Sequence, residues 1–426
     1  MGNLMTRCGA SFHTGAVLAF VSIIVVLSQS LMAQSKEEPK QGRTTPAPTA
    51  ASAPVTPARF VHPGIYYNTN DLAFMRQKLQ AKAEPWFSAW EKNKPGAKEE
   101  AWAPHPQAEW DATKDLYMGG DPVVAHKEAL QWALTGNPAH AAKAIEILNA
   151  WSSKLQTIVP HKMPQEKLGC GVNAHHFANA AELLCYGGPD GKASGWAPDD
   201  IQRFKKMLGL FYKVIEDFQS HYNGNWDAIM MNSMMCMGVF LDDQAMFDRA
   251  AKHYVVGEPS NGGLTNYIRP SGQCQESYRD MGHVQWGLGA FVALCEVAWK
   301  QGVDLYGKAD NRLLVGLEYS AKYNLGEEVP YEGPGTICKR GLYAPIWETA
   351  YQHYVYRKGL DMPYTKRIIY GTDLPVNGKN KSQPGSYRPE GGFSVGISWG
   401  TFTMFKGEDD PQAAKNVTTR PSGARP

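Results

Sequence analysis

The sequence lacks the signatures of several common enzyme classes. Its 426 residues contain no P-loop and no glycine fingerprint of a dinucleotide-binding fold. No Cys-x-x-Cys or His-x-x-x-His pair is present, so no dedicated metal site is indicated. The formal net charge is only +2, which gives no bulk electrostatic reason to bind nucleic acid. With 43% hydrophobic and 20% charged residues, the composition is typical of a packed globular protein.

Long apolar runs are also scarce, and the single clear one lies near the N-terminus. Residues 16–33, "AVLAFVSIIVVLSQSLMA", follow Arg7 and end in small residues, a pattern typical of an export signal cleaved at Ala33. We therefore predict a signal peptide over residues 1–33 and a secreted or periplasmic protein that has no membrane contact once the signal is removed. An uncleaved membrane anchor is the alternative. No other segment is long and apolar enough to span a bilayer.

Six cysteines remain after the predicted signal peptide. An even number in an exported chain permits disulfides. However, Cys185, Cys236 and Cys295 lie in apolar helical runs, which favours buried free thiols at these three positions.

Composition divides the rest of the chain into one domain with two flanking segments. Residues 34–58 and 407–426 are rich in proline, alanine, threonine and charge, so we predict a disordered linker and a disordered tail. Residues 59–406 then form the folded domain. Strand-type alternation is scarce in it, and the best examples are "TNYIRP" and "GFSVGISWGTFTMF".

Helical patterns dominate this domain. The segment "DPVVAHKEALQWALTG" places Pro122 just inside its start and Gly136 after its end, as helices often do. About ten segments have helical periodicity, and several are apolar on more than one face, which indicates helices packed on both sides. We predict an all-α fold in which helical hairpins form an (α/α) toroid, or barrel, around a central cleft. No fixed repeat period supports a solenoid.

The segment "QESYRDMGHVQW" carries an unusual amount of charge at the start of an apolar helix. Glu276, Arg279 and His283 are spaced three and four apart, so we expect them on one helix face, with Tyr278 beside them. An intrahelical ion pair is the simpler interpretation. Because the helix turns wholly apolar after Trp286, the alternative is that its charged end lines a site inside the fold.

Three further clusters contain candidate site residues. In "NGNWDAIMMNSMM", Asn225 is either the helix cap or an amide that faces a ligand, with Trp226 next to it. In "GCGVNAHHFANAAELL", Asn173, His175 and His176 are expected at a helix start. Adjacent helical residues point about 100° apart, so only one of the two histidines should face a given site.

The last cluster is "CKRGLYAPIWETAYQHY". Here Lys339, Arg340 and Tyr343 precede a helix and could bind an anionic substrate; ordinary loop charge is the alternative. The aromatic content of 11% is compatible with sugar binding, because ring faces stack on pyranoses, although large cores use the same residues.

Long blocks of the sequence resemble the alginate lyase superfamily of (α/α) toroid polysaccharide lyases. They are "NWDAIMMNSMMCMGVFLDDQAMFDRAAKHY", "NGGLTNYIRPSGQCQESYRDMGHVQWGLGAFVALCEVAW" and "DNRLLVGLEYSAKYNLG". The resemblance spans residues 61–359 and looks closest to polysaccharide lyase family 38, whose members act on alginate and glucuronan.

The resemblance also implies roles for individual residues. The related polysaccharide lyase family 5 has Asn-Asn-His at the equivalent helix start, where the asparagine helps neutralise the substrate carboxylate and the histidine assists proton transfer. This sequence has "GNW", so Asn225 is kept and Trp226 replaces the histidine. That family places arginine and tyrosine on the next helix, where this sequence supplies Arg279 and His283. His283 is therefore our candidate for the displaced imidazole role.

The implied reaction is β-elimination on a polyuronate, either alginate, above all mannuronate-rich alginate, or glucuronan. Asn225 with Arg279 or Arg340 would neutralise the substrate carboxylate, His283 would act as the base or as a carboxylate partner, and Tyr343 would act as the acid. His176 and Tyr278 are held in reserve for the base and acid. The remaining substrate-binding candidates are Asn173, His175, Trp226 and Glu276. The reaction needs no metal and no organic cofactor.

Two other functions fit the same residues. One is a glycoside hydrolase on a helical toroid that acts on an acidic polysaccharide with two carboxylates, chosen from Asp227, Glu276 and Asp280. The other is a non-catalytic protein that binds a polyuronate.

Overall fold

The computed structural model describes residues 57, 59–217, 224–257, 262–337, 339–371, 396, 400–410 and 412. The predicted signal peptide (1–33), the predicted linker except Pro57, and most of the predicted tail lie outside these residues. Cys338 lies outside them as well. The five cysteines within the described part are free; Cys236 and Cys295 are buried, as predicted, and Cys185 is half-buried.

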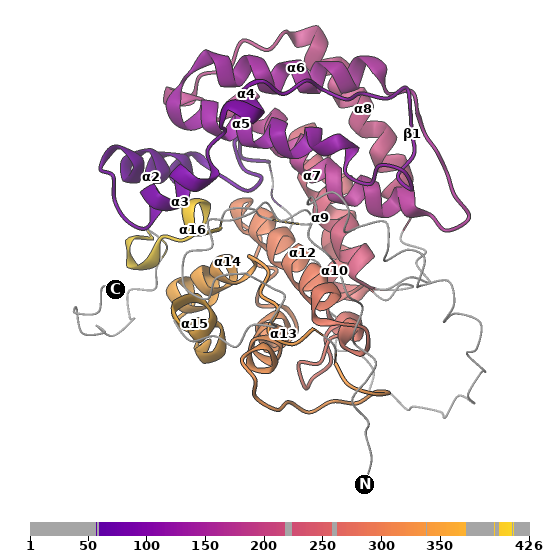
Figure 1. Cartoon of the computed structure of the whole chain (residues 1–426), viewed down its shortest axis with the longest axis vertical. Coiled ribbons are helices and arrows are strands. Elements are labelled where there is room, and N and C mark those ends of the chain that lie inside the picture. Colours follow the sequence, from indigo (N-terminus) through magenta and orange to yellow (C-terminus); the bar gives the residue numbers. More distant parts are fainter. Residues whose placement is uncertain are drawn as a thin grey trace. The chain divides into compact units, whose positions relative to one another are not determined.

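Helices account for almost all regular structure in these residues, which confirms the predicted all-α fold class (Figure 1). The α-helices are α2 (Thr69–Gln80), α3 (Trp86–Asn93), α4 (Ala97–Glu100), α5 (Asp121–Thr135), α6 (Pro138–Lys154), α7 (Gln165–Tyr186), α8 (Pro198–Ile215), α9 (Gly224–Leu241), α10 (Gln244–Val256), α11 (Leu264–Tyr267), α12 (Met281–Lys300), α13 (Lys308–Asn324), α14 (Trp347–Tyr351), α15 (Pro363–Tyr370) and α16 (Gly400–Thr403). Short helical turns are η1 (Met118–Gly120), η2 (Pro189–Gly191), η3 (Gln275–Tyr278), η4 (Gln352–Arg357, of π type) and η5 (Gly407–Asp409).

Strands contribute little to the described structure. Strands β1 (Glu109–Trp110) and β2 (Thr157–Ile158) form one parallel pair. Both segments with predicted strand patterns contain helix instead: α11 lies within "TNYIRP", and α16 lies within the described end of "GFSVGISWGTFTMF". The first segment keeps only an isolated bridge between Ile268 and Cys274. Runs this short are ambiguous, because neighbouring helices bury them in either conformation.

Local sequence sets the helix ends. Pro122 lies in the first turn of α5, and Gly136 ends this helix in the left-handed region at φ 71°, which a residue with a Cβ rarely adopts. The next residue, Asn137, caps α6 by accepting a hydrogen bond from the backbone N–H of Ala139. The chain therefore turns sharply between α5 and α6, and these two helices pack as a hairpin.

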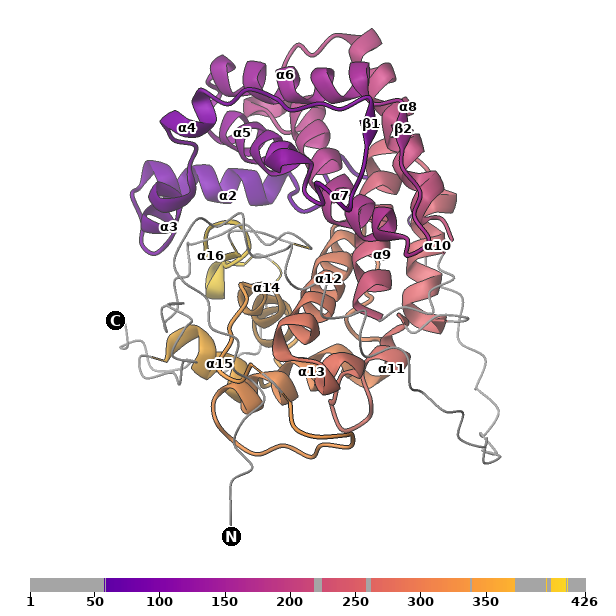
Figure 2. The same cartoon turned by 45° about the vertical axis from the view of Figure 1, so that its right-hand side comes forward.

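Burial separates the helices into inner and outer sets. In α9, every residue from Gly224 to Phe240 is buried. Helix α8 instead buries a single stripe, which consists of Phe204, Met207, Leu208, Phe211 and Ile215. The inner helices pack in the order α5, α7, α9 and α12, and the outer helices α6, α8, α10 and α13 each pack on the inner helix next to them in sequence. The same arrangement can be followed in Figure 2.

The inner helices α7, α9 and α12 run parallel. The segment that precedes α2 bonds to the C-terminal end of each: His62 contacts Glu182 of α7 and Asp242 just after α9, while Gln301, just after α12, bonds to the carbonyl of Gly64. The N-terminal ends of these helices therefore lie together at the opposite end of the row. Since a helix N-terminus carries a partial positive charge, this end favours anions.

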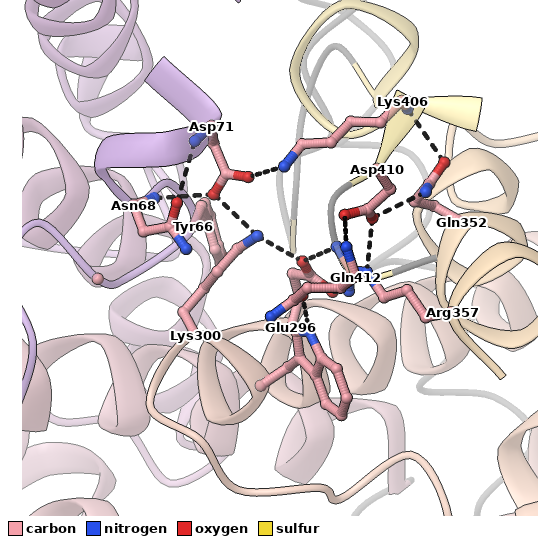
Figure 3. A network of polar contacts seen from close by, with 12 residues as sticks. Tyr66, Asn68, Asp71, Glu296, Lys300, Gln352, Arg357, Lys406, Asp410 and Gln412 are labelled. Carbon is pink, nitrogen blue, oxygen red and sulfur yellow. Dashed lines mark hydrogen bonds and ion pairs between the residues drawn. The ribbon is translucent and has the colours of Figure 1, made fainter. Parts of the chain in front are cut away.

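Contacts between helices close the inner row on itself. Helix α12 packs on α14, α14 packs on α16, α16 packs on α2, and α2 packs on α5. This closed series of helix pairs agrees with the predicted toroid. Figure 3 shows the polar network at the closure, where Asp71 of α2 pairs with Lys300 of α12 and with Lys406 beyond α16.

The network continues from Lys300 through Glu296 and Arg357 to Asp410. Lys300 lies 2.9 Å from Glu296, and Arg357 lies 3.0 Å from both Glu296 and Asp410. Asp410 is 4% exposed, so the chain is still packed into the fold there. The tail boundary predicted at residue 407 is therefore wrong, because buried ion pairs that composition does not reveal hold η5 and Asp410 in place.

Candidate active site

The charged segment before α12 is not part of that helix. Glu276 and Tyr278 belong to the separate turn η3, and Asp280 is extended at φ −174°. Its carboxylate accepts a hydrogen bond from the backbone N–H of His283 at 3.0 Å, so Asp280 is the N-cap of α12. The prediction that Glu276, Arg279 and His283 share one helix face is wrong, because the cap breaks the helical path between Arg279 and His283.

The cap also brings an imidazole, a carboxylate and an ammonium together. The Nδ1 atom of His283 lies 3.0 Å from Oδ1 of Asp280, and the Nζ atom of Lys339 lies 2.9 Å from Oδ2. Burial alone would raise the pKa of Asp280, but His283 and Lys339 outweigh it and hold that pKa well below its usual range. The side chain of His283 is 15% exposed, so part of the ring remains accessible.

Asp280 and Lys339 were not among the predicted site residues. A sequence signal for Asp280 exists, since an aspartate three residues before another residue at a helix start is a capping pattern. No sequence signal pairs Lys339 with Asp280, because the two residues come from separate segments.

Turn η3 carries a buried carboxyl beside a cation. Glu276 is fully buried, and its Oε2 atom lies 4.0 Å from Nη1 of Arg279. Burial raises the pKa of Glu276 to about 7, with Asp280 adding to the rise and Arg279 opposing it. Tyr278 is 48% exposed, one of the few large side chains in the described residues that face solvent to this extent.

The first turn of α9 lies against η3. The backbone N–H of Gly224 donates a 2.7 Å hydrogen bond to Oε1 of Gln275, which joins the start of α9 to the segment that precedes α12. Asn225 is inside the helix, so it is not the cap; it is fully buried, and neither atom of its side-chain amide has a hydrogen-bond partner among the described residues. Trp226 is buried next to it at 9% exposure. A buried amide without partners is costly, which points to a ligand that satisfies it.

Asp227 follows in the same turn and is also fully buried. Its Oδ2 atom lies 3.5 Å from Nε2 of His253 on the outer helix α10. The structure therefore brings Asn225, Trp226, Glu276, Tyr278, Arg279 and His283 to one end of the inner helices, as the sequence patterns require.

The predicted residues on α7 lie elsewhere. Asn173, His175 and His176 sit in the middle of this helix rather than at its start, and each is at most 2% exposed. Asn173 donates hydrogen bonds to the carbonyls of Leu116 and Gly169, which occupy its amide. The structure therefore places Asn173 in the core.

The two histidines belong to a single buried cluster. His175 contacts the hydroxyl of Tyr66 at 3.1 Å, and His176 contacts His126 at 3.0 Å between their Nδ1 atoms. The two rings lie 4.0 Å apart between centroids, so the expectation that adjacent histidines face different surroundings is wrong. Burial lowers the pKa of His126 to about 3 and that of His176 well below its usual value, so both are neutral.

Arg340 and Tyr343 hold the end of α13 to the following loop. Arg340 donates hydrogen bonds to the backbone carbonyls of Tyr323 and Glu327, and its guanidinium lies 4.2 Å from the centre of the Tyr323 ring. Tyr343 is 4% exposed and donates its hydroxyl to the carbonyl of Asn324 at 3.0 Å. These groups are therefore engaged with the protein backbone.

The described residues contain no group of three or more histidine, cysteine, aspartate or glutamate side chains arranged to hold a metal ion. Within the same residues, no helix combines the length and apolar character needed to cross a bilayer.

Comparisons with known proteins agree with this geometry. A family model described as alginate lyase matches residues 124–329. No curated protein matches the chain. A structure of a histidine-to-alanine variant of alginate lyase A1-III complexed with a tetrasaccharide is similar with a TM-score of 0.60 and 13% identity, over 82% of this chain and 98% of that chain.

Two further structures are similar over 82% of this chain. A tyrosine-to-phenylalanine variant of A1-III, also complexed with a tetrasaccharide, has a TM-score of 0.56 and 14% identity over 98% of its chain. Alginate lyase A1-III from Sphingomonas species A1 has a TM-score of 0.54 and 15% identity over its whole length, 100%. At these identities the structures show a shared fold.

Proposed function

Because this chain is a polysaccharide lyase of the alginate lyase superfamily, we propose that it cleaves a polyuronate by β-elimination. The substrate is alginate, above all mannuronate-rich alginate, or glucuronan. The products carry an unsaturated uronic acid at each new non-reducing end. The apolar segment at residues 16–33 supports export of the protein, and we propose that it works in the periplasm or outside the cell.

The observation that carries this proposal is the unpartnered amide of Asn225. It lies at the end of the molecule where the N-termini of α7, α9 and α12 gather, and η3 places Arg279 at this same end. A uronate carboxylate can accept hydrogen bonds from an amide and a guanidinium, and it is attracted to the positive ends of helices. The site can therefore be selective for an acidic sugar although the chain has almost no net charge.

Neutralising that carboxylate makes the neighbouring C5 proton acidic enough to remove. As the proton leaves, charge moves onto the carboxylate, where Asn225 and Arg279 stabilise it. His283 accepts the C5 proton, the electron pair of that bond forms the C4–C5 double bond, and the C4–O4 bond breaks. The departing O4 then takes a proton from an acid, which leaves all atoms and charges balanced.

The structure changes two of the residues assigned to this chemistry. Arg340 and Tyr343 bond to backbone carbonyls, so we assign the cation to Arg279 and the acid to Tyr278. Tyr278 is 48% exposed at the same end of the molecule, and the positive charge of Arg279 next to it in sequence would favour release of its proton. The tetrasaccharide complexes of alginate lyase A1-III support an oligosaccharide substrate for this fold.

Ultraviolet absorbance tests the proposal, since only elimination produces a double bond conjugated to the carboxylate. We would incubate the mature protein separately with polymannuronate, polyguluronate and glucuronan, and compare Asn225→Ala and His283→Ala with the parent. His161→Ala is the matched control, because His161 also pairs with an aspartate, Asp111, at 2.8 Å, but lies outside the proposed site.

We expect absorbance to rise on at least one polymer, to be lost in both site variants and to persist in the control. New reducing ends without absorbance would identify a glycoside hydrolase instead. Binding to a polymer without any cleavage would identify a non-catalytic polyuronate-binding protein.

A further inference from the structure

The residue that caps α12 faces the ring of the proposed base. We propose that Asp280 is a positioning residue that holds His283 with its Nδ1 proton toward the carboxylate, so that Nε2 accepts the C5 proton of the substrate, and that Lys339 keeps Asp280 ionised. This inference rests on the proposed elimination reaction. It adds two residues, Asp280 and Lys339, that neither the sequence patterns nor the family resemblance assigns.

Two contacts converge on one oxygen of Asp280. Its Oδ1 atom accepts the backbone N–H of His283 at 3.0 Å and lies 3.0 Å from Nδ1 of the same residue. The backbone bond fixes the carboxylate relative to the first turn of α12, so the imidazole meets an acceptor whose position is set by the helix. A neutral histidine has one protonated and one unprotonated nitrogen, and a carboxylate at Nδ1 selects the form in which Nε2 is the acceptor.

The local backbone is built to leave room for this arrangement. A Cβ atom at Gly282 would lie 2.9 Å from Oδ1 of Asp280, 3.4 Å from Cδ2 of Leu342 and 3.8 Å from Nζ of Lys339. Any side chain at residue 282 would therefore push the carboxylate away from His283. The glycine carries a cost, because it lies inside α12, where alanine would favour the helix by about 1 kcal/mol.

The charges around Asp280 come from three separate segments. Lys339 lies in the loop before α14, while Glu276 and Arg279 approach from η3 and its C-terminal end. The hydroxyl of Tyr267 in α11 donates to the backbone carbonyl of His283, which anchors the first turn of α12. Lys339 is the only cation that the structure places in an ion pair with Asp280 among the described residues.

Asp280→Asn separates the two roles of this residue. Asparagine is as good an N-cap as aspartate, so α12 should keep its start, while the negative charge beside the imidazole disappears. We expect kcat to fall about 10- to 100-fold with little change in KM, a loss of the size attributed to general-base catalysis. The acidic limb of the kcat/KM profile should move to lower pH by about one unit, because the protonated imidazole loses its counter-charge.

Lys339→Met should move the same limb in the opposite direction. Without the ammonium, the charge of Asp280 acts on the imidazole alone and stabilises its protonated form. The shift should be smaller, about a few tenths of a pH unit, because Lys339 is half exposed and screened by solvent. Opposite shifts in two variants of one ion pair are not expected from a loss of stability.

Gly282→Ala provides a test that removes no charge and no hydrogen-bonding group. It should lower kcat at least about 10-fold because the carboxylate is displaced, while the melting temperature stays equal or rises because alanine favours the helix. Gly209→Ala in α8 is the matched control, since a Cβ there meets nothing within 4 Å. This control should leave kcat unchanged.

The tautomer of His283 gives a readout that does not need activity. In protein labelled with ¹⁵N-histidine, with the signal of His283 assigned by its loss in His283→Gln, we expect Nδ1 to be protonated in the parent and this preference to weaken in Asp280→Asn. An Nε2-protonated ring in the parent would overturn the proposal. So would an unchanged kcat in Asp280→Asn, or a fall in kcat without any shift of the acidic limb. If the parent cleaves no polyuronate, the proposed function fails, and the tautomer alone decides whether Asp280 orients the ring.

Discussion

The closure of the helical ring depends on a buried carboxylate near the end of the described chain. Asp410 accepts hydrogen bonds through Oδ2 from Nε of Arg357 at 3.0 Å and from Gln352 at 2.9 Å, and its side chain is 1% exposed. Arg357 in turn binds Glu296 of α12 through two further nitrogens (Figure 3). We predict that Asp410→Asn destabilises the whole fold, although residue 410 lies far from α12 in sequence.

The size of the effect follows from these contacts. Breaking a buried ion pair by removing one partner costs about 3–5 kcal/mol, while losing a hydrogen bond to a charged group costs about 1.5–3 kcal/mol. Asparagine keeps one acceptor oxygen, so we expect a loss of about 3 kcal/mol in the free energy of unfolding. An unfolding entropy of about 2.1 cal/mol/K per residue over about 300 residues converts this to a fall of about 5 °C in Tm.

Asp409→Asn is the matched control. Asp409 is the neighbouring residue in the same chain segment and also forms an ion pair, 2.7 Å from Lys78, but its side chain is 59% exposed. An exposed pair of this kind contributes about 0–1 kcal/mol. Thermal and urea unfolding at pH 7 should therefore separate the two variants. Equal changes in both variants, or a loss below about 1 kcal/mol for Asp410→Asn, would refute the argument that burial makes this contact essential.

Three further predictions follow from the charges in the structure. Asp71 and Asp410 have pKa values below their ordinary range despite burial, because Lys300, Lys406 and Arg357 lie beside them; their stabilisation is present above the unfolded pKa of about 4 and is lost as pH falls through the folded values, so Tm should drop between pH 5 and pH 3, and less so in Asp410→Asn. Glu276 shows the opposite sign: its pKa of about 7 lies above the ordinary 4.5, so its ionised form destabilises the fold at higher pH, and Glu276→Gln should gain up to about 3 kcal/mol at pH 8 and nothing at pH 4 in urea unfolding. Arg279→Met should lower kcat in the ultraviolet assay at least about 10-fold more than Arg340→Met does, because Arg340 bonds to backbone carbonyls; a larger effect at Arg340 would restore the role that its sequence position suggests.

Helices were predictable from the sequence because they depend on local interactions. Pro122, Gly136 and Asn137 mark the α5–α6 hairpin through backbone preferences that act within a few residues. Apolar residues on more than one face of "WDAIMMNSMMCMGVF" predict a buried inner helix, and α9 is buried over its whole width. The same locality explains the wrong boundary at residue 407, where the chain has the composition of a tail and is nevertheless held by Arg357.

The candidate site was predictable only in part. Asn225 and His283 were found through the family resemblance, and the structure supplies the physical reason for Asn225, an amide without partners beside η3. The histidines of α7 show the limit of residue type as a guide. His175 and His176 look like site residues, yet they pack in the core with Tyr66 and His126, because a buried polar cluster and a binding site use the same side chains.

The sequence by itself determined where the helices begin, which faces are apolar and which family the chain resembles, since these properties reside in neighbouring residues. Only the tertiary structure decided which charges meet. Lys339 and Asp280 are 59 residues apart by their numbers, and their 2.9 Å contact exists because the loop before α14 returns to the start of α12. Electrostatic interactions act through space over a few ångströms, so the pairing that sets each carboxylate's ionisation is defined by packing and not by order along the chain.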